Sequence, residues 1–367
     1  MVGYLNMQHL RRQRFTAAGL ALAAMALFVA ACSSSGSSGS SGGSASGLSG
    51  TLNASGSTLQ LVYQQQAIQS FKSVQPSMTV NYGGGGSGKG RTDLASNVVQ
   101  FAGSDTAPIP SDEVANFKGK TVLYYPILIS PITVSYNLPG IKGLKLDAPT
   151  IAGIFQAKIT KWNDPAIASQ NPGVKLPSTA ITIAHRSDSS GTTQNFAQFL
   201  VDAAPGVWKL GNSSTIDWPA NSRGGNGNGG VAQIIKTTAG AVGYVDYADA
   251  KASGLTWASV KNKDGNYVEP SVQSATEAAS NAQLKPDLTF SPIWATGAQS
   301  YPIAAGSWVL VYQKQSSSNT TKMLKAYFGY LVGDGQKLLP QLGYAQLPSN
   351  IDQQAKAQLS KIGASAG

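Results

Sequence analysis

The chain has 367 residues, a formal net charge of +10 and a single cysteine. One cysteine excludes an internal disulfide, and two histidines are too few for a His/Cys metal cluster. The positive charge suits an anionic ligand, a nucleic acid or an anionic membrane, but beyond Arg14 the basic residues are scattered singly, without the runs or aromatic-interleaved patches typical of nucleic-acid binding.

Residues 1–31 have the pattern of a secretory signal, with three arginines ahead of the apolar run 15–31. That run falls short of the about 18 residues expected of a spanning helix. Cys32 follows Val-Ala-Ala, an ending that resembles a bacterial lipoprotein signal, in which Cys32 would become the acylated first residue. An ordinary signal cleaved nearby is the alternative. Without the three arginines, the formal net charge is +7.

Residues 33–50 are almost wholly Ser and Gly, a composition typical of a flexible coil that buries no core. We therefore predict that 32–50 is an acylated cysteine followed by a tether. The 336 residues that follow the signal suit two domains rather than one.

The turn 54–58, Ala-Ser-Gly-Ser-Thr, connects a strand that starts at Thr51 to a helix. The helix is indicated by apolar residues at helical spacing, namely Tyr63, Ala67, Phe71 and Val74. The first backbone N–H groups of a helix are unpaired and attract anions, so this turn is a candidate anion contact.

A second turn, 83–90, follows the predicted strand 78–82 and precedes a helix. Its glycines let backbone N–H groups approach an anion closely, and Lys89 with Arg91 is expected to raise the local positive potential. The turn departs from the phosphate-loop pattern at its last position, where Gly90 offers no hydroxyl for magnesium. We therefore set nucleoside triphosphate hydrolysis aside.

Asp105 ends the predicted strand 98–105 and is the least expected residue beside an anion site. Its structural role would be to cap a helix. Its functional role would be to accept a proton carried by the ligand, which favours a protonated oxyanion and repels one without a proton. Phosphate carries such protons near neutral pH and sulfate does not.

The turn 184–193, between the predicted strand 179–184 and a helix, is the third candidate contact. Arg186 offers a planar fork of donors to an oxyanion, and Asp188 could hold that guanidinium in place. On its own, the turn also fits a capped helix with a surface ion pair. Three Ser/Thr/Gly helix starts that converged on one point would form a desolvated anion site.

Strands and helices alternate along the rest of the chain, which argues for α/β architecture. The run 121–137 is too long for one ordinary strand and is expected to cross between domains. The Gly-rich loop 222–230 is either a fourth ligand-facing turn or a plain surface loop. Strand 308–312 would return the chain to the first domain, so that two crossovers form a hinge with a ligand cleft between the lobes. A final helix is expected from Ser349, whose S-x-x-D pattern resembles a capping box.

Several short motifs carry a family resemblance when they are taken in order. They are Ser55-Gly56-Ser57-Thr58, Val80-Asn81-Tyr82 with Gly86-Ser87-Gly88, Phe101 with Ser104-Asp105, Lys158 to Trp162, Arg186 and Asp188 with Ser190-Gly191-Thr192, and Gly240 to Val245. With these motifs the chain, from about Leu52 to Ile362, resembles the PstS family, the phosphate-binding lipoproteins of bacterial high-affinity phosphate importers.

The resemblance implies an α/β, two-lobed type II periplasmic-binding-protein fold with a hinge and an interdomain ligand cleft. Lobe I would comprise residues 51–128 plus 303–367, and lobe II residues 129–302. The phosphate ligands that it implies are Thr58, Leu59, Ser87, Asp105, Arg186, Ser190, Gly191 and Thr192. The family usually has an aromatic residue where Leu59 stands, but its contact there is through the backbone N–H. Gly88 and Lys89 replace a serine and a glycine that the family commonly has.

The resemblance also implies a function at the extracytoplasmic face of the cell membrane. A monomer anchored through Cys32 would bind inorganic phosphate and deliver it to the transmembrane subunits of an ABC permease for import. Helix-start N–H groups, hydroxyls and Arg186 would hold the phosphate, and Asp105 would accept one of its protons. No catalytic residue, metal, cofactor or nucleic acid is expected.

Three alternatives remain open. The same fold could bind another oxyanion such as sulfate or molybdate, against which Asp105 argues. A phosphatase would need Ser87 or Ser190 as its nucleophile, but His185 is the only histidine beyond the signal and no carboxylate–histidine cluster is evident. A structural or adhesive surface lipoprotein with a vestigial site is the third.

Overall fold

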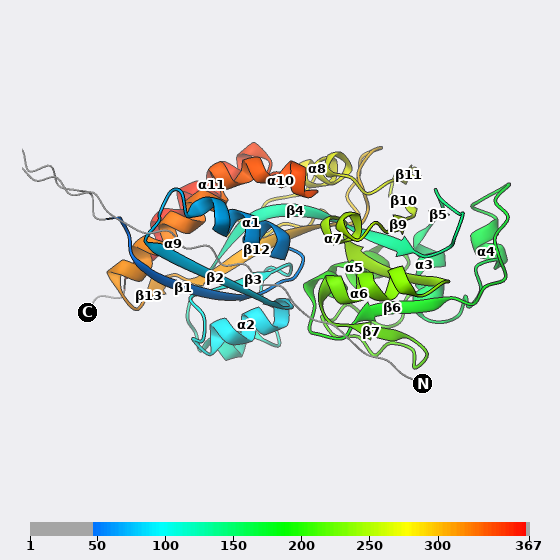
Figure 1. Ribbon diagram of the computed structural model, residues 1–367, viewed down its shortest axis with the longest axis horizontal. Coiled ribbons are helices and arrows are strands. Elements are labelled where there is room, and N and C mark those ends of the chain that lie inside the picture. The colour runs from blue at the N-terminus through cyan, green and yellow to red at the C-terminus, as the bar shows by residue number, and fades with distance from the viewer. Residues whose placement is uncertain (1–46, 365–367) are drawn as a thin grey trace, which may run out of the picture. The chain divides into compact units, whose positions relative to one another are not determined.

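The computed structural model describes residues 47–364, and the residues from Gly47 onward belong to one compact unit. The predictions for the signal 1–31, for Cys32 and for the tether up to residue 46 lie outside the described residues. Strands and helices alternate along the chain, as the sequence predicts (Figure 1). Within residues 47–364, no helix combines the length and apolar character needed to cross a bilayer.

The strands of the described chain are β1 (Gly50–Gly56), β2 (Met78–Gly85), β3 (Phe101–Ser104), β4 (Val122–Tyr136), β5 (Lys145–Leu146), β6 (Thr182–Arg186), β7 (Arg223–Gly225), β8 (Ala241–Asp246), β9 (Thr256–Trp257), β10 (Ser259–Lys261), β11 (Tyr267–Val268), β12 (Ala304–Tyr312), β13 (Lys314–Gln315) and β14 (Gly363–Ala364). Its helices are α1 (Leu61–Phe71), α2 (Ser87–Ala95), α3 (Ala148–Phe155), α4 (Pro165–Ala168), α5 (Gly191–Ala203), α6 (Gly227–Thr237), α7 (Tyr247–Ala252), α8 (Val272–Ser280), α9 (Ser318–Leu331), α10 (Leu339–Leu342) and α11 (Ser349–Gln358). Short 3-10 helices lie at Val114–Phe117, Asp334–Leu338 and Leu359–Lys361.

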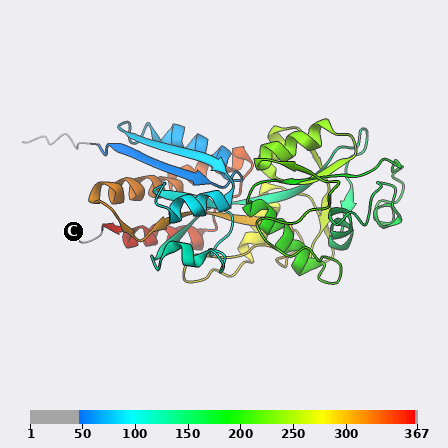
Figure 2. The same ribbon diagram turned by 90° about the horizontal axis from the view of Figure 1, so that it is seen from below.

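The main sheet of the described residues has the order β2-β1-β3-β12-β4-β8-β6-β7, with β9 also paired to β4. Residues 122–131 of β4 pair with β12, and residues 132–136 pair with β8. We call β2, β1, β3, β12 and residues 122–131 the first half-sheet, and residues 132–136 with β8, β6 and β7 the second half-sheet. Figures 1 and 2 show the green elements of the second half-sheet grouped apart from the blue, orange and red elements.

The expectation that the run 121–137 is too long for one strand is wrong, because β4 is a continuous strand of 15 residues. Two prolines do not break it. Pro126 lies opposite Trp308, next to a register shift that follows Ser307 in β12. The shift skips Ile127, whose carbonyl accepts a 2.7 Å hydrogen bond from Gln336 Nε2. Irregularities of this kind accommodate a proline and redirect neighbouring side chains.

Helix and strand boundaries differ from the prediction by a few residues. Strand β3 begins at Phe101 rather than at Val98, which is 63% exposed. Helix α1 ends at Phe71, and Val74 of the predicted apolar face is exposed. Helix α11 starts at Ser349, but the N-cap is Pro348 and no side chain caps the helix, so the capping box is wrong.

The core joins segments from the two ends of the described chain. The ring of Phe71 in α1 lies 5.2 Å from that of Tyr327 in α9, and Phe101 of β3 packs edge-on against Phe328 at 5.3 Å. Figure 1 shows blue α1 and orange α9 on the same side of the first half-sheet. This packing buries two polar side chains of α1, Gln60 at its N-cap and Gln64 in its first turn, beside the strand ends.

Candidate functional site

Helices α1, α2 and α5 each start at the carboxyl end of a strand. Strand β1 leads through Ser57 and Thr58 into α1, β2 leads into α2 at Ser87, and β6 leads through Ser190 into α5. In open α/β sheets this edge is where ligands bind. The side chains of Ser57, Thr58, Ser87 and Ser190 are all withdrawn from solvent.

Asp105 lies directly after β3 and is surrounded by hydroxyl groups. Its Oδ1 accepts hydrogen bonds of 2.6 Å from the hydroxyls of Ser57 and Ser307. Its Oδ2 lies 2.7 Å from Ser57 Oγ and 3.3 Å from Ser87 Oγ. Burial raises the pKa of Asp105 above its usual value, against the opposing effects of Ser307, Ser57, Arg186 and Ser87. Because the surrounding hydroxyls donate to it, the carboxyl group is placed as an acceptor in a site withdrawn from solvent.

Arg186 ends β6, and its guanidinium is held on two sides. Asp188 accepts from Nε at 2.7 Å and also from Nη2. Nη1 donates to Thr192 Oγ1 at 3.3 Å and to Asn228 Oδ1 at 3.0 Å. Burial raises the pKa of Asp188, but the hydrogen bonds and charge of Arg186 outweigh burial and hold that pKa below its usual value. The predicted Arg186–Asp188 pair is therefore present, with Arg186 buried and Asp188 partly buried rather than on the surface.

The aromatic core of the second half-sheet supports Arg186 from behind. The backbone N–H of Arg186 donates to Tyr244 Oη at 3.0 Å, and the hydroxyls of Tyr244 and Thr193 lie 2.6 Å apart. The Tyr244 ring stacks on Phe196 of α5 at 4.6 Å. These contacts fix the start of α5 relative to the end of β6, because rigid rings connect both elements.

The start of α5 meets the first half-sheet at Gly191. Ser190 is the N-cap, and its Oγ accepts from Thr193 N at 3.1 Å. A Cβ atom at Gly191 would lie 2.4 Å from Ser87 Oγ and 2.8 Å from Asp105 Cβ. No side chain fits in that space, so glycine is required for this approach.

Hydrogen bonds also join the two half-sheets on either side of Gly191. Gly88 N donates to Ser189 O at 3.0 Å, and Asn195 Nδ2 donates to Asp105 O at 2.7 Å. Leu59 contributes no such bond, because its N–H donates to Ser57 Oγ at 3.1 Å. The structure thus brings seven of the predicted residues to one place, and Leu59 is buried with its N–H already bonded to Ser57. They are Thr58, Ser87, Asp105, Arg186, Ser190, Gly191 and Thr192.

Asn228 is a residue of this site that the sequence analysis did not identify. Its Oδ1 accepts from Arg186, its Nδ2 donates to Thr192 Oγ1 at 3.4 Å, and its backbone N–H donates to Thr58 Oγ1 at 3.2 Å. Asn228 is fully buried in the first turn of α6. The loop 222–230 is therefore a fourth turn at the site, and its glycines before a helix were the available signal.

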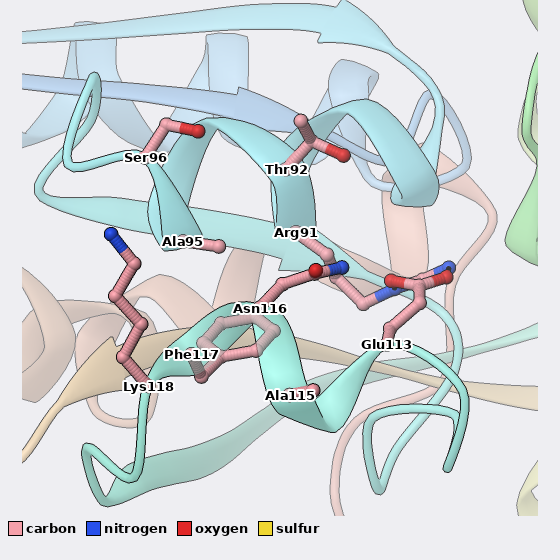
Figure 3. Close-up of a pocket in the computed structure, with 9 residues that line it drawn as sticks. All are labelled: Arg91, Thr92, Ala95, Ser96, Glu113, Ala115, Asn116, Phe117 and Lys118. Atoms are coloured by element: carbon pink, nitrogen blue, oxygen red, sulfur yellow. Dashed lines mark hydrogen bonds and ion pairs between the residues drawn. The ribbon is translucent and has the colours of Figure 1, made fainter.

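The two cations near Ser87 do not add charge to the site, contrary to expectation. Lys89 pairs with Asp93 at 2.6 Å. Arg91 is buried and donates from Nε and Nη2 to Glu113, at 2.6 Å each. Figure 3 shows Arg91 and Glu113 side by side in the wall of a separate cavity of about 420 Å³ between α2 and the 3-10 helix that follows β3.

In the part of the chain that the structure describes, His185 has no hydrogen bond to a serine hydroxyl. Its Nδ1 lies 2.9 Å from the Arg186 carbonyl, which can only accept, so Nδ1 carries the proton. Its ring stacks on Trp218 at 5.2 Å, and burial lowers the pKa of His185. Among the described residues, no group of three or more His, Cys, Asp or Glu side chains could hold a metal ion.

Comparison with known proteins defines the class of this fold. Residues 41–334 match the family model of the PBP superfamily domain. A phosphate-binding protein from Stenotrophomonas maltophilia superposes with a TM-score of 0.67, covering 84% of this chain and 93% of that chain at 20% identity. A phosphate-bound substrate-binding protein from Clostridium perfringens gives 0.62, covering 82% and 100% at 16% identity. The α/β, two-lobed type II periplasmic-binding-protein fold is therefore confirmed.

Sequence relatives define the family within that class. The phosphate-binding protein PstS of Pasteurella multocida is 36% identical over 285 residues, covering 76% of this chain and 81% of the relative. Phosphate-binding protein PstS2 of Mycobacterium bovis is 33% identical over 322 residues, covering 85% and 87%. The chain belongs to the PstS family of phosphate-binding proteins.

Proposed function

We propose that this protein binds inorganic phosphate outside the cytoplasm and delivers it to the transmembrane subunits of an ABC permease for import. The observation that carries the proposal is the meeting of buried Arg186 and buried Asp105 with three helix starts at one point. Cationic and N–H donors favour an oxyanion, whereas the carboxylate favours an oxyanion that brings a proton. Phosphate meets both conditions.

We assign the two half-sheets to the cores of the two lobes, 51–128 plus 303–367 and 129–302, with residues 129–131 of β4 still paired to β12 of the first half-sheet. The proposed phosphate contacts are Thr58, Leu59, Ser87, Asp105, Arg186, Ser190, Gly191 and Thr192, and the Leu59 N–H would exchange its bond to Ser57 Oγ for one to phosphate. In the structure several of these donors and acceptors satisfy one another across the site. Phosphate would replace those contacts, with its oxygens on Arg186 and the helix starts and its proton on Asp105. Selectivity follows because an unmatched buried polar group costs about 1–3 kcal/mol.

Binding of phosphate and sulfate by calorimetry, at two pH values and after removal of carried-over anion, tests this proposal. We expect micromolar or tighter phosphate binding and weaker sulfate binding. Equal binding of both anions would favour the general oxyanion alternative, and no binding of either would favour a structural surface protein.

The proposed activity is binding rather than catalysis. Ser87 Oγ accepts from Asp105 N at 3.1 Å and Ser190 Oγ caps α5, so both candidate nucleophiles have structural partners. The curated relatives named above are called phosphate-binding proteins. Incubation with a chromogenic phosphate monoester, with and without divalent metal, should give no turnover, and measurable turnover would favour the phosphatase alternative.

The protein is proposed to act as a monomer on the extracytoplasmic face of the cell membrane, anchored by acylation of Cys32. The signal pattern of residues 1–31 and the Ser/Gly composition of the tether support this location. Incorporation of labelled palmitate, lost in Cys32→Ser, would support the anchor. Equal labelling of that variant would contradict it.

A further inference from the structure

A chain of hydrogen-bonded, buried polar side chains runs beside the first half-sheet and ends on Asp105. Tyr327 Oη donates to Gln64 Oε1 at 2.7 Å, and Gln64 Nε2 donates to Gln60 Oε1 at 2.7 Å. Gln60 Nε2 donates to Ser307 Oγ at 2.9 Å, and Ser307 Oγ donates to Asp105 Oδ1 at 2.6 Å. We call Tyr327, Gln64, Gln60 and Ser307 the relay. All four side chains are fully buried.

The direction of the relay is fixed by a carbonyl group. Gln60 Nε2 also donates to Trp308 O at 3.0 Å, and a carbonyl oxygen can only accept. The NH₂ group of Gln60 must therefore face Ser307, and its Oε1 must face Gln64. The phenol of Tyr327 stays protonated, because burial raises its pKa far above its usual value. Every member of the relay thus donates toward Asp105.

Ser307 has a single hydroxyl hydrogen, and the relay determines where that hydrogen points. Because Gln60 donates to the Ser307 oxygen, the hydrogen of Ser307 is free to point only at Asp105 Oδ1. The hydrogen of Ser57 is not fixed in this way, because Ser57 Oγ lies 2.6 Å from Asp105 Oδ1 and 2.7 Å from Oδ2 and its hydrogen is shared between them. A protonated Oδ1 would bring two hydrogens against each other, so Oδ1 is held as an acceptor.

The other oxygen of Asp105 lies at the junction of the half-sheets. Oδ2 is 2.7 Å from Ser57 Oγ and 3.3 Å from Ser87 Oγ, and a Cβ at Gly191 would lie 3.0 Å from it. Ser57 contacts both carboxylate oxygens, but Ser307 contacts only Oδ1 and Ser87 contacts only Oδ2. Oδ1 therefore meets the relay, and Oδ2 meets the helix starts of the candidate site.

Ionisable groups on the neighbouring elements also act on Asp105. Arg186 lowers the pKa of Asp105 through its charge. Buried Asp246 interacts with Asp105 as a like charge when both are ionised. Burial raises the pKa values of Tyr82 and Tyr344, the charge of nearby Asp105 raises them further, and both phenols remain neutral. Of these ionisable groups, only Arg186 favours the carboxylate, and the hydroxyls of Ser307, Ser57 and Ser87 supply the rest.

We propose that the relay sets the anion selectivity of the site by holding Oδ1 of Asp105 as an acceptor, so that Oδ2 remains available for the proton of a protonated oxyanion. Ser307, Gln60 and Gln64 are positioning residues, because they act through Asp105. This inference rests on the proposed function, since it assigns a cause to the preference for phosphate.

Ser307→Ala is the decisive variant. Removal of a hydrogen bond to the carboxylate raises the pKa of Asp105, so selectivity for phosphate over sulfate should be lost at a higher pH than in the wild type. We call the pH at which half of the selectivity is lost the midpoint. Near the wild-type midpoint, the ratio of phosphate affinity to sulfate affinity should fall about tenfold in Ser307→Ala, the usual effect of one hydrogen bond to a charged group. Ser307→Thr, which keeps the hydroxyl, should restore the wild-type midpoint.

Two further variants separate the relay from simple packing. Ser130→Ala is the matched control, because Ser130 is a fully buried serine of β4 whose hydroxyl bonds to Pro131 O and not to Asp105. It should leave the midpoint unchanged. Tyr327→Phe removes only the far end of the relay and should shift the midpoint in the same direction as Ser307→Ala, but less.

The protonation of Asp105 can also be read without any ligand, from the carboxyl ¹³C chemical shift of the apo protein. This measurement separates the relay from the proposed function, because it does not require phosphate binding. A higher Asp105 midpoint in Ser307→Ala, but not in Ser130→Ala, supports the relay even if calorimetry finds no phosphate binding. An unchanged midpoint in folded Ser307→Ala, or the same shift in Ser130→Ala, overturns it.

Discussion

The backbone N–H of Asn228 donates a 3.2 Å hydrogen bond to Thr58 Oγ1, and this bond joins the first turn of α6 to the turn before α1. The two residues are 170 positions apart in the chain. The side chain of Asn228 meanwhile contacts Arg186 and Thr192. One residue therefore links the guanidinium on the second half-sheet to a hydroxyl on the first.

Asn228→Ala should weaken phosphate binding about tenfold or more. The variant keeps the N–H bond to Thr58 but leaves Nη1 of buried Arg186 without its amide acceptor, which costs about 1–3 kcal/mol. Calorimetry gives the change in Kd. Asn226→Ala is the control, because Asn226 is exposed on the same loop and its side chain makes no capping bond. Equal affinity in the two variants would remove Asn228 from the site.

Asp105→Asn should narrow the preference for phosphate over sulfate. The amide places an NH₂ group among hydroxyls that already donate, so the site loses its acceptor for a ligand proton. Competition calorimetry across pH measures the ratio. In the wild type the preference should fall as pH falls through the raised pKa of Asp105, whereas the variant should show no such transition. Unchanged discrimination would remove the proposed role of the carboxylate, and Asp112→Asn on the surface should behave as wild type.

Gly191→Ala should abolish the close approach of α5 to the first half-sheet. Its Cβ would lie 2.4 Å from Ser87 Oγ, so the two elements must separate, and overpacking of this kind costs about 1–3 kcal/mol. We expect at least a tenfold loss of phosphate affinity in a folded protein, measured by calorimetry with circular dichroism as the folding check. Gly229→Ala is the matched control, because a Cβ there meets nothing within 4 Å. Wild-type affinity in Gly191→Ala would show that this contact is not needed.

Asp246→Asn should remove a pH dependence of folding stability. Asp246 is fully buried, its Oδ1 has no hydrogen-bond partner among the described residues, and burial with nearby Asp249 raises its pKa. The folded protein therefore holds a proton that the unfolded chain has lost above its ordinary pKa, and stability should fall as pH rises from about 4 through the raised pKa.

Urea unfolding at several pH values measures this effect. The slope of stability against pH should flatten in Asp246→Asn and stay unchanged in the exposed control Asp217→Asn. The amide can still cap α7 through the acceptor that Asp249 N uses at 3.2 Å, so the helix should be retained. A wild-type slope in Asp246→Asn would place the titrating group elsewhere.

Local sequence was sufficient for the parts of the site that neighbouring residues build. Each helix start follows a predicted strand, because Ser, Thr and Gly are the residues that begin helices and turns. The Arg186–Asp188 pair lies within one turn, so its members meet whatever the rest of the chain does. The position of Asp105 after β3 could be predicted for the same reason.

Local sequence was insufficient where residues distant in the chain determine the structure of a segment. The run 121–137 remains one strand because both of its faces are covered and its register shift accommodates Pro126. Nothing in the run itself reveals its neighbours β12 and β8. Arg91 likewise looks like a free cation in the sequence, but Glu113, which is 22 positions away, neutralises it.

By itself, the sequence determined the α/β class, the three anion-facing turns, and the arginine and carboxylate expected at them. Only the tertiary structure decided what surrounds that carboxylate, because Ser307 reaches Asp105 across 202 positions and Gln60 reaches Ser307 across 247. Hydrogen bonds are directional and act over about 3 Å, so no spacing within a segment can reveal which distant strand supplies a donor.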